Sequence, residues 1–339
     1  MILLDTTSAA SWRHASGLAR VSGRLLEELG ASARAAQWPS LGPAAGGGDW
    51  LLTPELFSEA ERPGFTTFLD NRPCPVAAVY HDAIPIKLPH ITWPKSVERH
   101  PGYMKLLSRF DRVWAVSNAS RAELLGFWEW QGIAKPPPVE VLALGADWRG
   151  IARIAEAPPR RSGLHRIVSI GILEPRKNQG VLLDAFEALR AEGLAFELHL
   201  VGRVNPHYGE PIARRVAALA ARYTGVRHHE GLKDAAVADL VRSARATAFP
   251  SIAEGCGLPV LESLWMGVPC VCSDIAPVLE NASGGGCAVV AGNTLKGWVE
   301  ALRRIITNDA HHAALAAEAE RRPLPTWAGA AKTLREALT

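Results

Sequence analysis

The chain has 339 residues, a formal net charge of +3 and 48% hydrophobic residues. This length is enough for two domains of ordinary size, each with a substantial core. The small net charge gives no reason to expect nucleic acid as a partner.

The five cysteines and the hydropathy pattern bear on localisation. The cysteines are odd in number and lack the paired C-x-x-C spacing of a structural zinc site, so we expect reduced thiols and a cytoplasmic protein. The chain starts without a basic segment and contains no long apolar stretch. We therefore expect neither a signal peptide nor a membrane span, and any membrane contact would be peripheral, at the inner face of the cytoplasmic membrane.

Short apolar runs alternate with helical patterns along the whole chain. The helical period is clearest where Val181, Leu182, Ala185, Phe186 and Leu189 recur on one face. Such alternation predicts an α/β protein with parallel sheets covered on both faces. The predicted strands are 2–4, 76–80, 113–116, 139–142, 167–170, 198–201, 246–249, 268–272 and 288–290.

A proline-rich and arginine-rich stretch at 149–163 interrupts this pattern and is the predicted linker. It divides the chain into an N-terminal domain over 1–155 and a C-terminal domain over 160–323. A last helix over 326–339, with Thr326 as its N-cap, is predicted to join the first domain.

Two glutamates eight positions apart lie in the run SIAEGCGLPVLESLWMG at 251–267. The run predicts a strand end, a tight loop with flexible glycines, and a helix with Pro259 at its first position and Gly267 at its exit. Glu254 would lie on the loop and Glu262 in the first helical turn, where a helix start attracts phosphate. The alternative is a capped helix with two solvated glutamates.

A second loop carries two cations. The predicted strand at 167–170 runs into GILEPRKN at 171–178, where Arg176 and Lys177 could neutralise a diphosphate. Ligands of parallel α/β sheets bind at the carboxyl ends of the strands, so these cations and Glu254 would share one rim. Alternatively, they are ordinary loop cations.

These stretches resemble family 4 of the retaining glycosyltransferases, a family with the GT-B fold of two facing Rossmann-like domains and an interdomain cleft. The resemblance covers nearly all of the second domain and includes the family's E-x7-E spacing. The EPRKN wording at 174–178 is similar to bacterial mannosyltransferases of surface polysaccharide assembly. The matching segments are 171–178, 198–202, Gly231, 249–262, 267–269 and 273–274, with weaker matches at 17–20, 81–82, 116–117 and 144–145.

The resemblance implies a role for each matching residue. His81, Arg176, Lys177 and Glu254 are the implied catalytic residues, with the two cations on the diphosphate, Glu254 on the donor-sugar hydroxyls and Glu262 on the ribose diol. A structural role for the lone His81 is the alternative. The implied donor-binding residues are Gly17, Arg20, Gly171, Arg176, Lys177, Gly231, Leu232, Glu254, Gly255, Cys256, Gly257, Leu258 and Glu262.

Two features set limits on the resemblance. Cys256 stands where the family usually has an aromatic residue, which puts the shape of the sugar pocket in doubt. The chain also lacks the D-x-D triplet with which many other transferases hold a metal. We therefore expect no metal and no cofactor, with cations and a helix start stabilising the diphosphate instead.

The acceptor region is expected after His81, with Asp82, Lys87 and Trp93 as candidate acceptor-binding residues. A solvated loop is the alternative. The aromatic run at 127–130 suggests either contact with a membrane that carries a lipid-linked acceptor or ordinary packing at a helix end.

The sequence therefore predicts a retaining, metal-independent hexosyltransferase with a nucleotide diphosphate sugar as donor, GDP-mannose being favoured, and a saccharide or lipid-linked saccharide as acceptor. Sugar-nucleotide epimerisation is an alternative reaction of the same fold. A catalytically inert subunit that binds sugar nucleotides or glycans within a glycosyltransferase complex is the alternative from another class.

Overall fold

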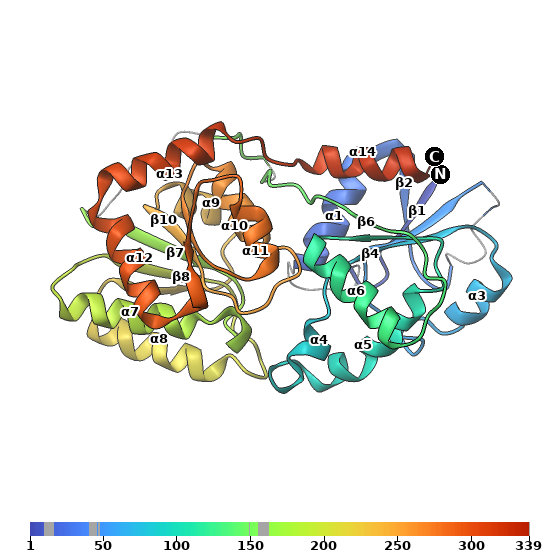
Figure 1. Ribbon diagram of the computed structural model, residues 1–339, viewed down its shortest axis with the longest axis horizontal. Coiled ribbons are helices and arrows are strands. Elements are labelled where there is room, and N and C mark those ends of the chain that lie inside the picture. The colour runs from blue at the N-terminus through green and yellow to red at the C-terminus, as the bar shows by residue number, and fades with distance from the viewer. Residues whose placement is uncertain (10–16, 41–45, 47, 149, 155–162, 339) are drawn as a thin grey trace. The chain divides into compact units, whose positions relative to one another are not determined.

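The computed structural model describes residues 1–9, 17–40, 46, 48–148, 150–154 and 163–338. The chain divides into two compact units. The first contains Met1–Gly145 and Pro325–Thr339, and the second contains Ala146–Leu324. Figure 1 shows helices packed around a twisted sheet in each unit.

The first unit contains a parallel sheet of six strands in the order β2-β1-β3-β4-β5-β6. The order reverses at β1, so β1 and β3 are neighbours although β2 lies between them in the chain. The strands are β1 Ile2–Asp5, β2 Ala33–Ala36, β3 Trp50–Thr53, β4 Val76–Tyr80, β5 Arg112–Ala115 and β6 Val139–Val141. The helices are α1 Gly17–Leu29, η2 Gly30–Ser32, α3 Phe65–Asn71, α4 Ile84–Lys87, η3 Pro89–Ile91, α5 Pro94–Leu107, α6 Asn118–Trp130 and α14 Trp327–Leu338.

The second unit also contains a parallel six-stranded sheet, with the order β12-β11-β10-β7-β8-β9. Its first strand, β7, lies between β8 and β10, which is the strand order of the dinucleotide-binding doubly wound fold. The strands are β7 Arg166–Ile170, β8 Glu197–Val201, β9 Val226–His229, β10 Ala246–Phe249, β11 Cys270–Ser273 and β12 Cys287–Val290. The helices are η4 Pro175–Lys177, α7 Gln179–Ala191, α8 Glu210–Arg222, α9 Asp234–Arg242, α10 Leu258–Trp265, α11 Ala276–Ala282, η5 Ala291–Asn293, α12 Leu295–Thr307 and α13 Asp309–Arg321.

Apolar side chains cover both faces of the second sheet. Phe186 of α7 and Trp298 of α12 are fully buried in the core on one face. Val237 and Val241 of α9 pack with Val168 and Val201 in the core on the other face. This two-sided burial explains why the strands are continuous apolar runs and not alternating patterns.

The predicted α/β architecture with two parallel sheets is confirmed. The predicted strands at 76–80 and 246–249 coincide with β4 and β10, and the others differ from the observed strands by one or two residues at an end. The prediction missed β2, β3 and β9. Both β2 and β9 are edge strands with polar residues and partly exposed positions, so they lack the buried apolar run on which the prediction relied.

The division between the units lies at Gly145 and Ala146, and not at residue 155. Trp148 and Ile151 belong to the core of the second unit, because they pack with α9 and with Met266. Of the predicted linker, Ile151 therefore packs on that core, whereas Arg149 and 155–162 lie outside the described residues.

The last helix returns to the first unit. Helix α14 packs along α1, as Figure 1 also shows. The Thr326 hydroxyl accepts a hydrogen bond from the Gly329 N–H at 3.1 Å, so Thr326 is the N-cap. Trp327 lies against Gly145 so closely that a Cβ at Gly145 would be 2.2 Å from the Trp327 nitrogen.

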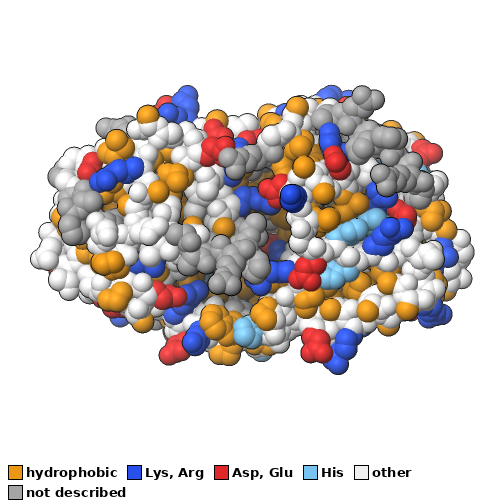
Figure 2. Space-filling model, turned by 180° about the vertical axis from the view of Figure 1, so that it is seen from behind, with side chains coloured by type: hydrophobic (Ala, Val, Ile, Leu, Met, Phe, Trp, Pro, Cys, Tyr) orange, Lys and Arg blue, Asp and Glu red, His pale blue; other side chains and the backbone are white. Residues whose placement is uncertain are grey.

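The surface carries charges of both signs, as the small net charge of the chain suggests. On the face drawn in Figure 2, basic and acidic side chains occur close to one another over both units. Among the described residues, no helix is both long enough and apolar enough to cross a membrane.

Candidate active site

The candidate site of the second unit is built on the loops that follow its two central strands. Strand β7 leads through Gly171 into η4, which carries Arg176 and Lys177. Strand β10 leads into the loop that carries Glu254. Because β7 and β10 are neighbours where the strand order reverses, both loops border the crevice in which doubly wound folds bind ligands.

The structure brings Arg176, Lys177 and Glu254 together as an ion cluster. Lys177 Nζ donates a hydrogen bond to Glu254 Oε1 at 2.6 Å, and Arg176 Nη1 lies 3.0 Å from Glu254 Oε2. All three side chains are at most 20% exposed. One carboxylate therefore bridges both cations that the sequence assigned to the diphosphate.

Burial and charge shift the pKa values of both Glu254 and Lys177. Burial alone would raise the pKa of the Glu254 carboxyl, but the charges of Lys177 and Arg176, with the hydrogen bond from Lys177, lower it overall. Burial lowers the pKa of Lys177, with Glu254 opposing this effect. Lys177 Nζ also lies 5.1 Å from the centre of the Phe249 ring, a cation–π contact that suits a partly desolvated ammonium.

Small residues allow the two loops to come close to these side chains. A Cβ at Gly171 would lie 3.4 Å from the Lys177 side chain, so the lysine stem packs across this glycine. Gly257 has φ +84° and ψ +43° and forms the N-cap of α10. This left-handed conformation favours glycine and turns the chain from the Glu254 loop into the helix.

Glu262 is 5% exposed and lies on α10. The helix starts at Leu258 and not at Pro259, so Glu262 lies in the second turn, which corrects the predicted placement in the first. Gly267, with φ +72°, follows the helix end, as predicted.

Cys256 lies between Gly255 and Gly257 on the loop. Its carbonyl accepts a hydrogen bond from Asn281 Nδ2 at 2.6 Å. Burial, together with the nearby carboxylates Glu254, Glu280 and Glu262, raises the pKa of the Cys256 thiol to about 12. The side chain is therefore an uncharged thiol near both predicted donor-binding glutamates.

Gly231 and Leu232 follow β9, at the same edge of the sheet. Gly231 has φ +72°, and Leu232 is 38% exposed just before α9. An exposed apolar side chain at this edge suits the flat face of a nucleobase.

In the first unit, His81 follows β4 directly. Its Nε2 lies 2.8 Å from the Pro54 carbonyl, and a carbonyl only accepts, so Nε2 carries the proton and Nδ1 is the basic nitrogen of the neutral ring. Burial lowers the pKa of His81, which favours this neutral form at pH 7. Ser120 Oγ donates a hydrogen bond to the His81 carbonyl at 2.6 Å, which fixes the backbone at this position.

Gly17 is the first residue of α1 and is exposed, and Arg20 lies on the same helix. The preceding residues 10–16 lie outside the described residues.

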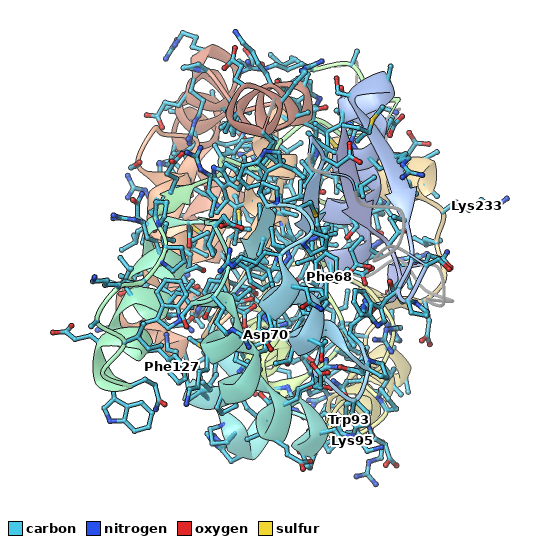
Figure 3. All side chains as sticks on the ribbon, turned by 90° about the vertical axis from the view of Figure 1, so that its right-hand side faces the viewer. Phe68, Asp70, Trp93, Lys95, Phe127 and Lys233 are labelled. Atoms are coloured by element: carbon cyan, nitrogen blue, oxygen red, sulfur yellow. The ribbon has the colours of Figure 1, made fainter. Side chains whose placement is uncertain are left out.

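The candidate acceptor residues are mostly engaged within the first unit. Asp82 Oδ1 accepts a hydrogen bond from the Ile84 N–H at 2.9 Å and so caps the turn into α4. Lys87 pairs with Glu123. Trp93 is 41% exposed, and Lys95 lies over its ring, with the two side chains next to each other in Figure 3.

The aromatic run at 127–130 is divided between core and surface. Trp128 is fully buried and donates its indole N–H to the Met104 carbonyl at 2.7 Å. Trp130 is 77% exposed, and Phe127 lies 5.9 Å from it between ring centres. Packing at a helix end therefore accounts for Trp128, and Trp130 is the most exposed aromatic residue of this run.

Sequence reasoning assigned no role to two groups of residues. Glu174 accepts hydrogen bonds from Arg176 and from Asn205, and the only signal for Glu174 was its presence in the EPRKN run. In the first unit, Arg62 lies buried between Asp5 and Glu55, at 3.4 Å and 2.6 Å, where β1 and β3 end. No sequence pattern indicated this second cluster, because its members come from separate segments.

Within the described residues, no group of three or more His, Cys, Asp and Glu side chains is arranged to hold a metal ion. All five cysteines are free thiols.

Comparison with solved structures defines the class of fold. The chain aligns over 100% of its length with all of WaaG, a glycosyltransferase involved in lipopolysaccharide biosynthesis, at a TM-score of 0.70 and 14% identity. It aligns over 99% of its length with 98% of Anabaena Alr3699/HepE in complex with UDP and glucose, at a TM-score of 0.73 and 16% identity. The two parallel sheets with flanking helices therefore form the GT-B fold of glycosyltransferases.

Sequence comparison finds a family similarity in the second unit. Residues 165–308 match the family described as glycosyl transferases group 1. This matching segment contains Arg176, Lys177, Glu254 and Glu262.

The chain is also similar to named bacterial enzymes. It is 28% identical to serotype-specific mannosyltransferase WbdA of Escherichia coli over 225 residues, which are 60% of this chain and 26% of that protein. It is 27% identical to the D-inositol 3-phosphate glycosyltransferase of Rhodococcus opacus (strain B4), over 67% of this chain and 52% of that protein. The chain therefore spans between about a quarter and about half of the length of these relatives.

Proposed function

We propose that this protein is a retaining glycosyltransferase that moves a hexose from a nucleotide diphosphate sugar to a saccharide or lipid-linked saccharide in surface glycan synthesis. The observation that carries the proposal is the Glu254 carboxylate bridging Arg176 and Lys177 beside β7 and β10. Mannose from GDP-mannose is the favoured donor, because the relatives with similar sequence include proteins named mannosyltransferases.

Donor binding begins with an exchange of partners. The diphosphate competes with Glu254 for the two cations, since phosphate oxygens accept the same N–H bonds as a carboxylate. Glu254, released from Lys177, then accepts hydrogen bonds from the hydroxyls of the donor sugar, while Glu262 accepts them from the ribose diol.

The chemical step replaces one bond at the anomeric carbon by another on the same face. The bond between the anomeric carbon and the departing phosphate oxygen breaks through an oxocarbenium-like transition state. The acceptor oxygen bonds to the anomeric carbon, and its proton passes to the departing phosphate oxygen. Arg176 and Lys177 stabilise the negative charge that grows on the diphosphate, which replaces a metal ion in this role.

The first unit supplies the remaining groups of the proposal. His81, with its basic Nδ1, contacts the donor sugar, and Gly17 and Arg20 bind the diphosphate. Asp82 and Trp93 contribute to the acceptor site, and Lys87 joins them once it leaves Glu123. The protein acts in the cytoplasm, where the exposed Trp130 provides peripheral contact with the inner face of the membrane.

The decisive experiment measures release of nucleoside diphosphate. The purified protein is incubated with GDP-mannose, UDP-glucose and ADP-glucose, each with and without EDTA. We expect release from one donor, unchanged by EDTA and lost in Glu254→Ala. Glu192→Ala is the matched control, because Glu192 pairs with Arg303 on the surface of the same unit.

The two main alternatives predict different results. A catalytically inert binding subunit would be stabilised thermally by nucleotides but would release no nucleoside diphosphate, even with candidate acceptors present. A metal-dependent enzyme would lose activity in EDTA and regain it with added divalent ion.

A further inference from the structure

The guanidinium of Arg176 is held from two sides. Its Nε and Nη2 both donate to Glu174 Oε1, at 3.0 Å and 2.6 Å. Its Nη1 donates to the Ala253 carbonyl at 3.0 Å and lies 3.0 Å from Glu254 Oε2. Glu174 thus binds the Nε and Nη2 edge of the guanidinium plane. The loop after β10 contacts the guanidinium at Nη1.

The second oxygen of Glu174 is also engaged. Asn205 Nδ2 donates a hydrogen bond to Glu174 Oε2 at 2.8 Å. Asn205 itself is fixed on the loop after β8, because its N–H donates to the Leu173 carbonyl at 3.1 Å and its Oδ1 accepts from the His207 N–H at 2.9 Å. Both Glu174 oxygens therefore serve side chains of the protein.

Tight backbone packing sets the distance between these loops. Leu173 and Val204 form an isolated parallel bridge, so the loops after β7 and β8 run side by side there. A Cβ at Gly209 would lie 2.3 Å from the Leu173 carbonyl oxygen, which leaves room only for glycine. Asn205 thus presents its amide to Glu174 from a backbone that has little freedom to move.

Burial and charge make the Glu174 contact consequential. The Glu174 side chain is 13% exposed and Arg176 is 20% exposed, unlike a surface pair. Charge-assisted hydrogen bonds in such positions contribute more than exposed ones. Glu174 and Glu254 together balance the two positive charges of Arg176 and Lys177, so the cluster is neutral before a donor arrives.

We propose that Glu174 is a positioning residue, which, through Arg176, sets the geometry for the donor diphosphate; this rests on the proposed function. When the diphosphate displaces Glu254, Nη1 of Arg176 already points toward the position that the diphosphate takes. The charge of Glu174 also limits the attraction of the site for the nucleoside diphosphate product. Loss of that charge should therefore slow turnover while leaving product binding unchanged or tighter.

The first test compares Glu174→Gln with Glu192→Gln, the same chemical change in a surface pair with Arg303. The donor is whichever of GDP-mannose, UDP-glucose and ADP-glucose the wild-type protein hydrolyses, and its nucleoside diphosphate is the binding probe. We expect Glu174→Gln to lower kcat by at least about tenfold, because one charge-assisted hydrogen bond is lost. Binding of the nucleoside diphosphate product should not become weaker. Glu192→Gln should stay within about twofold of wild type.

Reversing the hydrogen bond between residues 174 and 205 should restore the activity lost in Glu174→Gln. In Glu174→Gln the new amide group faces the Asn205 amide, donor against donor. The double variant Glu174→Gln/Asn205→Asp restores a donor and an acceptor at this contact and the original net charge, so kcat should recover. Equal kcat in Glu174→Gln and its control, or no recovery in the double variant, would overturn the proposal. Weaker product binding in step with kcat would instead make Glu174 a ligand contact.

A second measurement does not depend on catalysis. In protein labelled with ¹⁵N-arginine, the Arg176 Nε–H signal, assigned with Arg176→Lys, should exchange slowly in the wild type and faster in Glu174→Gln. An unchanged signal would refute the positioning role. If the wild type neither releases nor binds any nucleoside diphosphate, the proposed function fails, whereas this signal still decides whether Glu174 positions Arg176.

Discussion

Lys177 Nζ lies 2.6 Å from Oε1 of Glu254, although the two residues are 77 positions apart in the chain. Both side chains are at most 12% exposed, and Arg176 approaches the other oxygen of the same carboxylate. The cation proposed to bind the diphosphate and the carboxylate proposed to bind the sugar thus pair with each other. Under the proposed function the donor breaks this pair, which would couple the stability of the unit to donor binding.

Removal of the lysine charge should reveal this coupling. Lys177→Met leaves the buried Glu254 with Arg176 alone, and we expect the free energy of unfolding of the second unit to fall by about 1–3 kcal/mol. The double variant Lys177→Met/Glu254→Gln should regain much of this stability, because it leaves no poorly compensated carboxylate. Urea unfolding measures the stability, and nucleoside diphosphate release should be lost in both variants. Turnover in the double variant would contradict the assigned roles.

Gly145 should be intolerant of any side chain. A Cβ there would lie 2.2 Å from the backbone nitrogen of the buried Trp327, so Gly145→Ala must displace the start of α14. We expect a loss of about 1–3 kcal/mol in the first unit, the usual cost of overpacking.

The control for Gly145 lies in the middle of α6, where nothing is within 4 Å of a Cβ added at Gly126. Gly126→Ala should raise stability by about 0.5–1 kcal/mol, because alanine is the better helix former. Chemical denaturation of both variants measures the two changes in unfolding free energy, which should have opposite signs. Similar stability changes in both would refute the close packing at Gly145.

The stability of the second unit should depend on the protonation of His199. Burial, with the charge of Arg166 and the neighbouring His229, lowers the pKa of His199 to about 4. The unfolded chain binds the proton more tightly, since its histidine has a pKa near 6.5, so acid favours unfolding. Stability should fall by up to about 1.4 kcal/mol per pH unit from about pH 6.5 to 4 on account of this residue.

His199→Gln removes the titrating group while it keeps a polar side chain. The urea midpoint of the variant should depend less steeply on pH over this range. The number of protons taken up on unfolding should be smaller by about one. An identical slope in variant and wild type would mean that another group is responsible.

Cys256 should react slowly with alkylating reagents in the folded protein. With a pKa of about 12, its thiolate fraction at pH 8 is about one in ten thousand. We expect iodoacetamide to label Cys256 at least about a hundredfold faster in urea than in buffer, followed by mass spectrometry of its peptide. Equal rates in both conditions would show that the thiol is neither buried nor raised in pKa.

Parts of the fold were predictable because they depend on local pattern. The runs at 76–80 and 246–249 are apolar and fully buried, and they coincide with β4 and β10. The turn at Gly267 and the N-cap at Thr326 follow from single residues with strong backbone or capping preferences. Edge strand β9, with Arg227 and two histidines, has no such pattern, because only one neighbouring strand pairs with it.

The contacts of the candidate site were less predictable. The sequence placed Arg176, Lys177 and Glu254 on loops at strand ends, but nothing local indicated that Glu254 would bridge both cations. The role of Glu174 depends on Asn205, which comes from the loop after a different strand. The buried contact of Arg62 with Asp5 and Glu55 likewise joins three segments.

By itself, the sequence determined the class of fold, the loops that carry charged residues and the resemblance to family 4 of the retaining glycosyltransferases, because these depend on short patterns of burial, turns and motif spacing. Only the tertiary structure decided which of those charges meet. The strand order places β7 beside β10 and so brings side chains 77 positions apart within hydrogen-bonding distance. Strand order results from long-range pairing and from the packing of helices on both faces, for which no single segment of the chain carries a signal.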